Sequence, residues 1–382
     1  MATAPPRSPS ANVGAGAYVL AGSTSELVMS MTTIQEQAGV LALTRATHGA
    51  PWFHTARVIL DAGSALKLLD GACASRDEDD RAHAAALAAR VGPADLAWGR
   101  ELIAAMRAEG VHLVTVLDAV YPGNLLWAYD RPPFLWVRGG FRPGDHRAVT
   151  VIAGHAAGHA TAAARALAEA GLVVVAPLRT PVDAAVHRAA LAAGGRTVCV
   201  PEGGVGDLAA LGEYASVAER IAERGAVVSS CWPGTAPGGR AADRARVVTC
   251  GLADCLYVVD GADGGPSSRH VAEALHTGKH VFVSQRLHQE QPWARRAGAR
   301  GGMTVRQGGR GPRDRQVGEP GVERPLQRRD LAGVGRPAVP LRPLLRLRPR
   351  RGPPGGVAAG AAGPGMIRAR VHGRLPLPVR RM

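Results

Sequence analysis

Several arginines cluster in the second half of the chain, where their spacing suits contact with phosphate groups. Arg240, Arg244 and Arg246 lie close together, directly before an apolar stretch that is typical of a helix. Guanidinium groups match phosphate oxygens in geometry, so this cluster predicts contact with a polyanion. A solvated helix face is the alternative interpretation of the same three residues. Arg179 and Lys279 are further basic candidates in this half of the chain.

Three turns rich in glycine or serine could bind an anion through their backbone amides. Gly154-His155 follows an apolar run and precedes a helical stretch, and a helix N-terminus there can bind phosphate. In the turn PEGGVG at 201–206, backbone amides can approach a ligand closely. Ser267 and Ser268, which end the turn GADGGPSS, can cap a helix or line its anion-binding end. A purely structural turn remains the alternative in each case.

Residue types used in metal sites and covalent catalysis are present without the spacing that such sites need. The histidines show no metal-ligand spacing, and the five cysteines are scattered, which predicts reduced thiols. No nucleophile elbow, P-loop or pair of acids points to catalysis. Asp183 and His187, four apart at a predicted helix start, are interpreted as capping and packing residues. We therefore expect no metal and no cofactor.

Strands and helices are predicted to alternate through the region that carries these residues. Short apolar runs occupy 149–153, 172–176, 197–200, 226–229, 256–259 and 281–284. Ala-rich helical stretches lie between them, at 158–170, 182–193, 214–224, 243–252 and 268–277. Runs that are apolar throughout indicate strands buried on both faces. This alternation predicts an α/β, Rossmann-like, doubly wound and mainly parallel sheet, in which ligands bind beyond the carboxyl ends of the strands.

Helices are predicted ahead of this sheet. Residues 31–75 are expected to form a small helical domain, and 76–110 a helical connector. The sheet domain is expected to span 111–306 and to open with two strands, at 111–117 and 134–137.

The positive charge of the chain is concentrated near its end. The net charge is +15, but residues 307–382 hold 17 Arg and four acids, whereas the other 306 residues hold 29 basic and 27 acidic groups. The charge therefore does not mark the folded part as a basic nucleic-acid binder. The Arg/Gly/Pro-rich tail is predicted to be disordered, as are residues 1–30. A nucleic-acid-binding arm, a solvated extension and translation in a shifted reading frame all remain open for the tail.

No membrane contact is predicted. Every stretch of about 18 residues contains charge or proline, which argues against a spanning helix. The first residues lack the apolar core of a signal peptide. We expect a cytoplasmic protein.

Several stretches, taken in order, resemble the DNA-processing protein A (DprA/Smf) family. Leu117–Leu125 with Pro132–Gly139 is similar to the family's entry into its sheet domain. Val182–Val198 is similar to its GIDxxAHxxAL…GGxT segment, and Arg244–Leu252 to its RNRIIxGL segment. The resemblance covers about residues 33–306 of the sequence.

The resemblance implies a Rossmann-like domain behind a small helical domain of the SAM or helix-hairpin-helix kind, a homodimer, and no enzymatic activity. It implies binding of single-stranded DNA and loading of the RecA recombinase during natural transformation and DNA recombination. In the family, arginines of a G-S-R turn and of the R-N-R segment contact the strand. Here His155 replaces the first arginine, and it can hydrogen-bond phosphate although it is mostly neutral at pH 7. The expected DNA-binding residues are Gly154, His155, Arg179, Arg240, Arg244, Arg246, Ser267, Ser268 and Lys279.

Two other functions stay open. Nucleotide phosphoribohydrolases share a related architecture, and 201–206 loosely resembles their PGGxGT loop. A degenerate module without retained binding is the second alternative. Aromatic residues, which stack on unpaired bases, make up only 4% of the chain, and Trp232 is the obvious candidate near a strand end.

Overall fold

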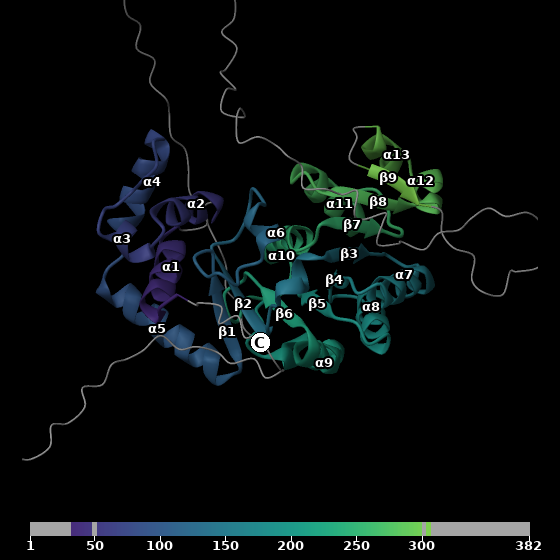
Figure 1. Ribbon diagram of the computed structural model, residues 1–382, viewed down its shortest axis with the longest axis horizontal. Coiled ribbons are helices and arrows are strands. Elements are labelled where there is room, and N and C mark those ends of the chain that lie inside the picture. The colour runs from purple at the N-terminus through teal and green to yellow at the C-terminus, as the bar shows by residue number, and fades with distance from the viewer. Residues whose placement is uncertain (1–31, 48–51, 300–302, 307–382) are drawn as a thin grey trace, which may run out of the picture. The chain divides into compact units, whose positions relative to one another are not determined.

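A nine-stranded sheet organises the described part of the chain, residues 32–47, 52–299 and 303–306 of a computed structural model. Its strands follow the order β1-β2-β6-β5-β4-β3-β7-β8-β9 (Figure 1). The strands are β1 (Val111–Thr115), β2 (Phe134–Gly139), β3 (Ala148–Ile152), β4 (Val173–Pro177), β5 (Thr197–Val200), β6 (Ala226–Ser229), β7 (Cys255–Val258), β8 (His280–Ser284) and β9 (Met303–Arg306). The predictions for 1–30 and 307–382 lie outside the described residues.

Most of the sheet is parallel. β3 pairs in parallel with β4 on one side and β7 on the other, and the parallel pairing continues outward to β6 and to β9. Only β2 is antiparallel to both of its neighbours, β1 and β6. The predicted α/β fold with a doubly wound, mainly parallel sheet is confirmed.

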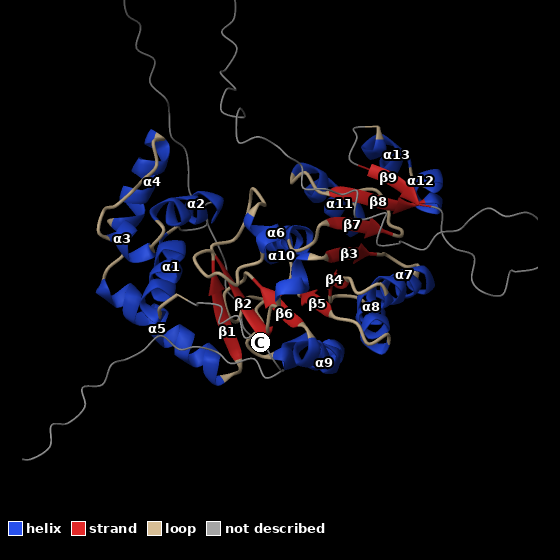
Figure 2. Ribbon diagram, in the orientation of Figure 1, coloured by secondary structure: helices blue, strands red, loops and turns tan. Residues whose placement is uncertain are grey.

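The crossover helices cover both faces of this sheet. α7 (Ala157–Glu169), α8 (Pro181–Ala192) and α9 (Ala215–Arg224) connect β3, β4, β5 and β6 in turn. The chain then crosses back through α10 (Gly239–Gly251) to β7, and α11 (Pro266–His276) leads to β8. Because parallel crossovers are right-handed, the change of direction puts the two sets of helices on opposite faces (Figure 2). The strand order reverses between β3 and β7, which makes their carboxyl ends the topological switch point.

Several short elements were not predicted from the sequence. These are α6 (Gly123–Leu126), the 3-10 helices η1 (Pro143–His146) and η2 (Leu208–Tyr214), α12 (Gln285–Glu290), α13 (Pro292–Gly298) and the strand β9. Elements of four to seven residues span too few turns to show a hydrophobic period, so the sequence pattern does not reveal them.

Five helices precede the sheet and share a core with its first strands. They are α1 (Ile34–Ala46), α2 (Trp52–Ala62), α3 (Ala65–Leu69), α4 (Glu78–Ala88) and α5 (Pro93–Ala108). The side-chain amide of Gln37 on the buried α1 donates to the Leu113 carbonyl of β1 (3.2 Å). The Glu36 carboxylate accepts from the Ala65 amide (2.7 Å) and so caps α3. The division of this region into a domain and a connector remains a prediction.

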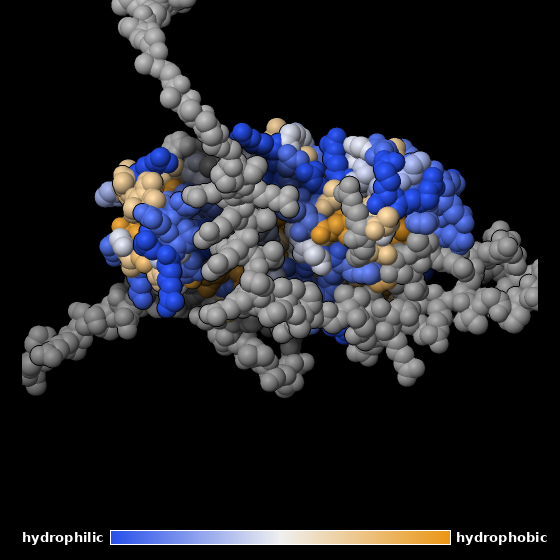
Figure 3. Space-filling model, turned by 90° about the horizontal axis from the view of Figure 1, so that it is seen from above, coloured by the Kyte–Doolittle hydropathy of each residue, from blue (hydrophilic) through white to orange (hydrophobic). Residues whose placement is uncertain are grey.

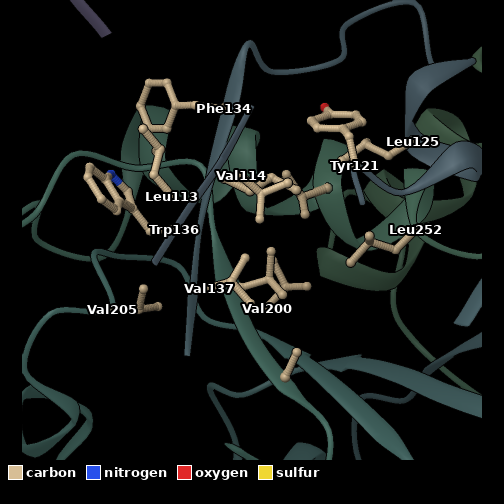
Figure 4. Packing of buried hydrophobic residues seen from close by; sticks show 14 of the residues in the cluster. Leu113, Val114, Tyr121, Leu125, Phe134, Trp136, Val137, Val200, Val205 and Leu252 are labelled. Carbon is tan, nitrogen blue, oxygen red and sulfur yellow. The ribbon is translucent and has the colours of Figure 1, made fainter. Parts of the chain in front are cut away.

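The strands β1 and β2 are buried on both faces. Leu113, Phe134 and Trp136 lie on one side of the strand pair, and Val114 and Val137 lie on the other (Figure 4). All five belong to one hydrophobic cluster that also contains buried residues of α1 to α5. Burial on both faces explains why most residues of these strands are apolar, with His112, Thr115 and Arg138 as the polar exceptions.

The surface gives no sign of a membrane span. Within the described ranges, every helix is too short or too polar to cross a bilayer. The face seen in Figure 3 is mainly hydrophilic, with smaller apolar patches. All five cysteines are free thiols, and four of them are buried.

A buried histidine joins α8 to the sheet and makes stability depend on pH. His187 Nε2 donates to the Pro177 carbonyl (3.0 Å), and Nδ1 lies 2.7 Å from the Thr197 hydroxyl. Burial lowers the pKa of His187 to about 4. This confirms the packing role expected for the residue, and Asp183 caps α8 as expected by accepting from the Thr180 amide.

We expect the free energy of unfolding to fall as the pH drops from about 6.5 to 4. Over that range the unfolded chain protonates His187 whereas the folded chain does not, so the difference is about 3 kcal/mol for this residue. Urea unfolding at a series of pH values measures it. His187→Gln should reduce the slope over that range by the share of one histidine, because His270, whose pKa burial also lowers to about 4, keeps its own share. An unchanged slope in the variant would contradict the assignment.

Candidate nucleic-acid interface

The carboxyl edge of the parallel strands gathers most of the candidate residues. Gly154-His155 follows β3, Arg179 follows β4, and Ser267 and Ser268 open α11 after β7. The helix α10 also begins at this edge, because it leaves β6 and returns to the start of β7. Only Lys279 lies at the other edge.

At the switch point a carboxylate of the chain itself fills the turn after β3. Asp260, directly beyond β7, accepts hydrogen bonds from the backbone amides of Gly154 (2.6 Å), His155 (2.9 Å) and Ala156 (3.0 Å). These are the amides at the start of α7 that the sequence suggested for phosphate. They are occupied by Asp260, whereas the exposed side chain of His155 remains a predicted DNA contact.

Arg240 and Arg244 share one face of α10. Four residues span about one helical turn, so their side chains leave the helix in nearly the same direction. The Arg244 guanidinium lies 3.5 Å above the ring centroid of Trp52 on α2, a cation–π contact. Burial lowers the pKa of Arg244, and Arg240 lowers it further. The two positive groups therefore lie close enough to interact.

Arg246 faces away from Arg244, toward α11. Arg246 is two residues beyond Arg244 on the helix, a rotation of about 200° around the helix axis, so the two side chains point to nearly opposite sides. Arg246 pairs with Asp243 (2.7 Å) and lies 3.9 Å from Glu273. Its charge is therefore balanced by two carboxylates, which leaves it less suited than Arg244 to bind a phosphate.

Arg179 follows β4 at the carboxyl edge of the sheet. Its guanidinium is 3.4 Å from the Glu202 carboxylate. Burial lowers the pKa of His270, and the charges of Arg246 and Arg179 both lower it further. Arg179 and Arg246 therefore each pair with carboxylates of their own surroundings, Arg179 with Glu202 and Arg246 with Asp243 and Glu273.

The two serines of α11 make internal contacts. The cap of α11 is Gly265, with no side-chain hydrogen bond, so the expected serine cap is wrong. The Ser268 hydroxyl instead donates to the Gly265 carbonyl (2.9 Å). Ser267 is buried against Gly261, where a Cβ would come within 2.3 Å of the serine side chain. Packing explains both residues, and their predicted contact with DNA is still untested.

Lys279 lies at the amino end of β8, away from the other candidates. Its ammonium donates to the Asn124 carbonyl (3.3 Å), and burial lowers its pKa. Its basic side chain predicts a phosphate contact, but the direction of β8 places it at the amino edge of the sheet. A strand bound along the carboxyl edge would not meet it.

The glycine-rich turn at 201–206 packs against another backbone segment. The Gly204 amide donates to the Thr235 carbonyl (3.1 Å). A Cβ on Gly203 would lie 2.8 Å from the Thr235 oxygen, and one on Gly204 would lie 2.9 Å from the Trp232 oxygen. Close backbone packing therefore requires these glycines, which removes the reason to interpret the turn as a phosphate loop.

Trp232 belongs to an aromatic cluster between α2, α5 and the sheet. Its ring lies 4.7 Å from Phe134, 5.7 Å from Trp98 and 5.9 Å from Trp52, measured between centroids. Only part of the residue is accessible. Stacking within the cluster is its main role in this structure.

Sequence reasoning missed three residues that contact the candidate groups at the carboxyl edge. Asp260 accepts from the turn after β3, Glu273 lies near Arg246, and Trp52 lies under Arg244. Asp260 carries one recognisable signal, an acid directly after a buried strand and opposite a glycine turn at a strand-order reversal. No comparable signal marks Trp52 or Glu273, because each meets its arginine across a long sequence separation. Among the described residues, no group of three metal-ligating side chains converges.

Comparisons with known proteins agree with this architecture. Residues 112–300 match the family model described as DNA recombination-mediator protein A. The chain is 26% identical over 191 residues to the DNA processing protein DprA of Bacillus subtilis (strain 168), which covers 48% of this chain and 63% of that protein, less than two thirds of its length.

Two solved structures are also similar. The DNA processing protein A of Streptococcus pneumoniae superposes with a TM-score of 0.52 and 21% identity, over 72% of this chain and 94% of that chain. The Helicobacter pylori protein, whose structure concerns its single-stranded DNA binding mode, gives 0.44 and 19%, over 51% and 90% of the two chains.

The protein is thus a doubly wound α/β protein that has arginines at the carboxyl edge of its parallel strands and five helices, α1 to α5, ahead of its sheet. The sheet domain at residues 112–300 belongs to the DNA-processing protein A (DprA) family, a family of DNA recombination mediators.

Proposed function

We propose that this protein binds single-stranded DNA at the carboxyl edge of its parallel strands. The observation that carries the proposal is the pair Arg240 and Arg244 on one face of α10, whose first turn lies at that edge. Two guanidinium groups at this spacing can contact neighbouring phosphates of a strand. Membership of the DprA family supports a polynucleotide as the ligand.

Finer roles rest on family membership alone. We propose that the protein loads RecA onto the bound strand during natural transformation, acts as a homodimer in the cytoplasm, and has no enzymatic activity. RecA-dependent strand exchange with and without the protein tests the loading, and light scattering tests the dimer. The nucleotide-hydrolase alternative loses its main support, because the turn at 201–206 is explained by backbone packing.

Replacing both Arg240 and Arg244 with glutamine should weaken binding of a dT strand on the order of tenfold and reduce the salt slope of log K by about 1.4. Glutamine removes the guanidinium that lies over Trp52, so urea unfolding of the double variant checks that the fold is retained. Fluorescence anisotropy of the full chain at several salt concentrations measures both effects.

The control removes the same charge away from the carboxyl edge: Arg165→Gln with Arg220→Gln, both exposed, on α7 and α9. An equal loss in both double variants would show that total charge, rather than this face of α10, holds the strand. A wild-type chain that binds no single-stranded DNA would refute the proposed function and favour the degenerate module.

A further inference from the structure

Two aromatic side chains project into solvent from the segment between α6 and β2. Trp127 is 75% exposed and Tyr129 is 56% exposed. In the described ranges, the other large hydrophobic side chain with comparable exposure is Ile34, at 42% on α1. Exposing large rings in water is unfavourable, so two of them in one short segment indicate a surface that a ligand covers.

Tyr129 is held in position by rings from two other elements. Its centroid lies 4.8 Å from that of Phe53 on α2, with only 31° between the ring planes. His276, at the end of α11, meets it edge-on at 6.2 Å. We call Phe53, Trp127 and Tyr129 the aromatic platform. A ring held by neighbours loses little conformational freedom when a further ring stacks on it.

The aromatic platform adjoins the arginine pair through the first turn of α2. Trp52 and Phe53 are consecutive residues: Trp52 contacts the Arg244 guanidinium, and Phe53 contacts Tyr129. Guanidinium groups and exposed rings thus flank one turn of helix. This combination of cations for the backbone and rings for the bases is typical of surfaces that bind single strands.

The surroundings of the platform favour bases over phosphates and over a protein. Arg131 donates to the Ala128 carbonyl, and the pKa of Glu273, raised mainly by burial, is raised further by the charge of Asp130, so both signs of charge lie nearby. Phosphates gain little from such a mixture. Leu125 and Ala128 are buried, so what projects is two rings rather than the broad apolar area of a protein interface.

We infer that the aromatic platform stacks unpaired bases of the DNA strand whose phosphates Arg240 and Arg244 contact. This inference rests on the proposed function and extends it from the backbone to the bases. Stacking on an aromatic ring tolerates any base, so the platform adds affinity without sequence preference.

The test compares a dT strand with an abasic strand of equal length, using anisotropy on the full chain. Trp127→Ala with Tyr129→Ala should weaken dT binding at least about fivefold for each ring lost. Binding of the abasic strand and the salt slope should not change, because no phosphate contact is removed. Tyr129→Phe, which keeps the ring, should retain binding in the wild-type background, and Ile34→Ala controls for loss of another exposed apolar side chain.

The outcomes separate this inference from the proposed function. A wild-type chain that binds neither strand overturns the function itself. If the wild type binds but the double variant binds dT equally well, the proposed function stands and base stacking on the aromatic platform is refuted. An equal loss on the abasic strand, or a change in oligomeric state without a change in DNA binding, also overturns base stacking.

Discussion

Arg196→Ala is expected to lower the free energy of unfolding by roughly 3–5 kcal/mol, the cost of breaking a buried ion pair from one side. Arg196 Nε and Nη2 donate to the two carboxylate oxygens of Asp145, at 2.5 and 2.8 Å, and the two side chains are only 14% and 12% exposed. The same guanidinium donates to the carbonyls of Arg224 (2.6 Å) and Gly140. Alanine would take this donor from the Arg224 and Gly140 carbonyls and would leave the Asp145 carboxylate with the Arg142 amide as its donor.

Urea unfolding of the purified variant measures this loss. Arg196→Lys should fall between wild type and alanine, because an ammonium cannot make the paired contact with both oxygens. The matched control is Arg286→Ala, which breaks an ion pair that is 69% and 53% exposed and should cost less than about 0.5 kcal/mol. An equal loss of unfolding free energy in Arg196→Ala and Arg286→Ala would show that the contacts of Arg196 with Asp145 and Gly140 do not stabilise the packing of β2, η1 and β5.

Asp260→Ala should lower the free energy of unfolding by about 2–4 kcal/mol, because three backbone amides lose a charged acceptor at once. Water can replace part of the lost bonding, since the turn is partly accessible. Asp260→Asn keeps an acceptor oxygen and should cost less. Asp263→Ala, an exposed acid three residues further on, controls for loss of a negative charge in the same turn.

The same variant tests whether the carboxylate occupies the anion position of the fold. With Asp260 removed, the free amides at the start of α7 should bind inorganic phosphate, so phosphate should raise the melting temperature of Asp260→Ala. The wild-type chain should show a smaller rise. A rise of the same size in both proteins would mean that Asp260 does not fill this position.

The parallel strands and their crossover helices were predictable because each shows a hydrophobic pattern among neighbouring residues. Each predicted apolar run from 149 to 284 became a parallel strand within one or two residues of its expected ends. Burial on both faces demands uninterrupted valine-rich runs, and the intervening alanine-rich stretches match the helices α7 to α11. Short elements such as α12, α13 and β9 escaped prediction because they hold too few residues to show a period.

The candidate site was predictable in its location but not in its contacts. Strand direction places the turn at Gly154, Arg179 and the start of α11 at one edge, and places Lys279 at the other. The divergence of Arg244 from Arg246 follows from helical geometry, but their partners Trp52 and Glu273 come from distant parts of the chain. The exposure of Trp127 and Tyr129 likewise depends on how α2, α6 and α11 meet.

The amino-acid sequence alone determined the class of fold, the family and the edge at which ligands are expected, because periodicity and motif order are properties of neighbouring residues. The tertiary structure decided which polar groups are already satisfied from within, as Asp260 satisfies the turn after β3. It also decided which rings and guanidinium groups meet. Such pairings join residues far apart along the chain, and no local pattern encodes them.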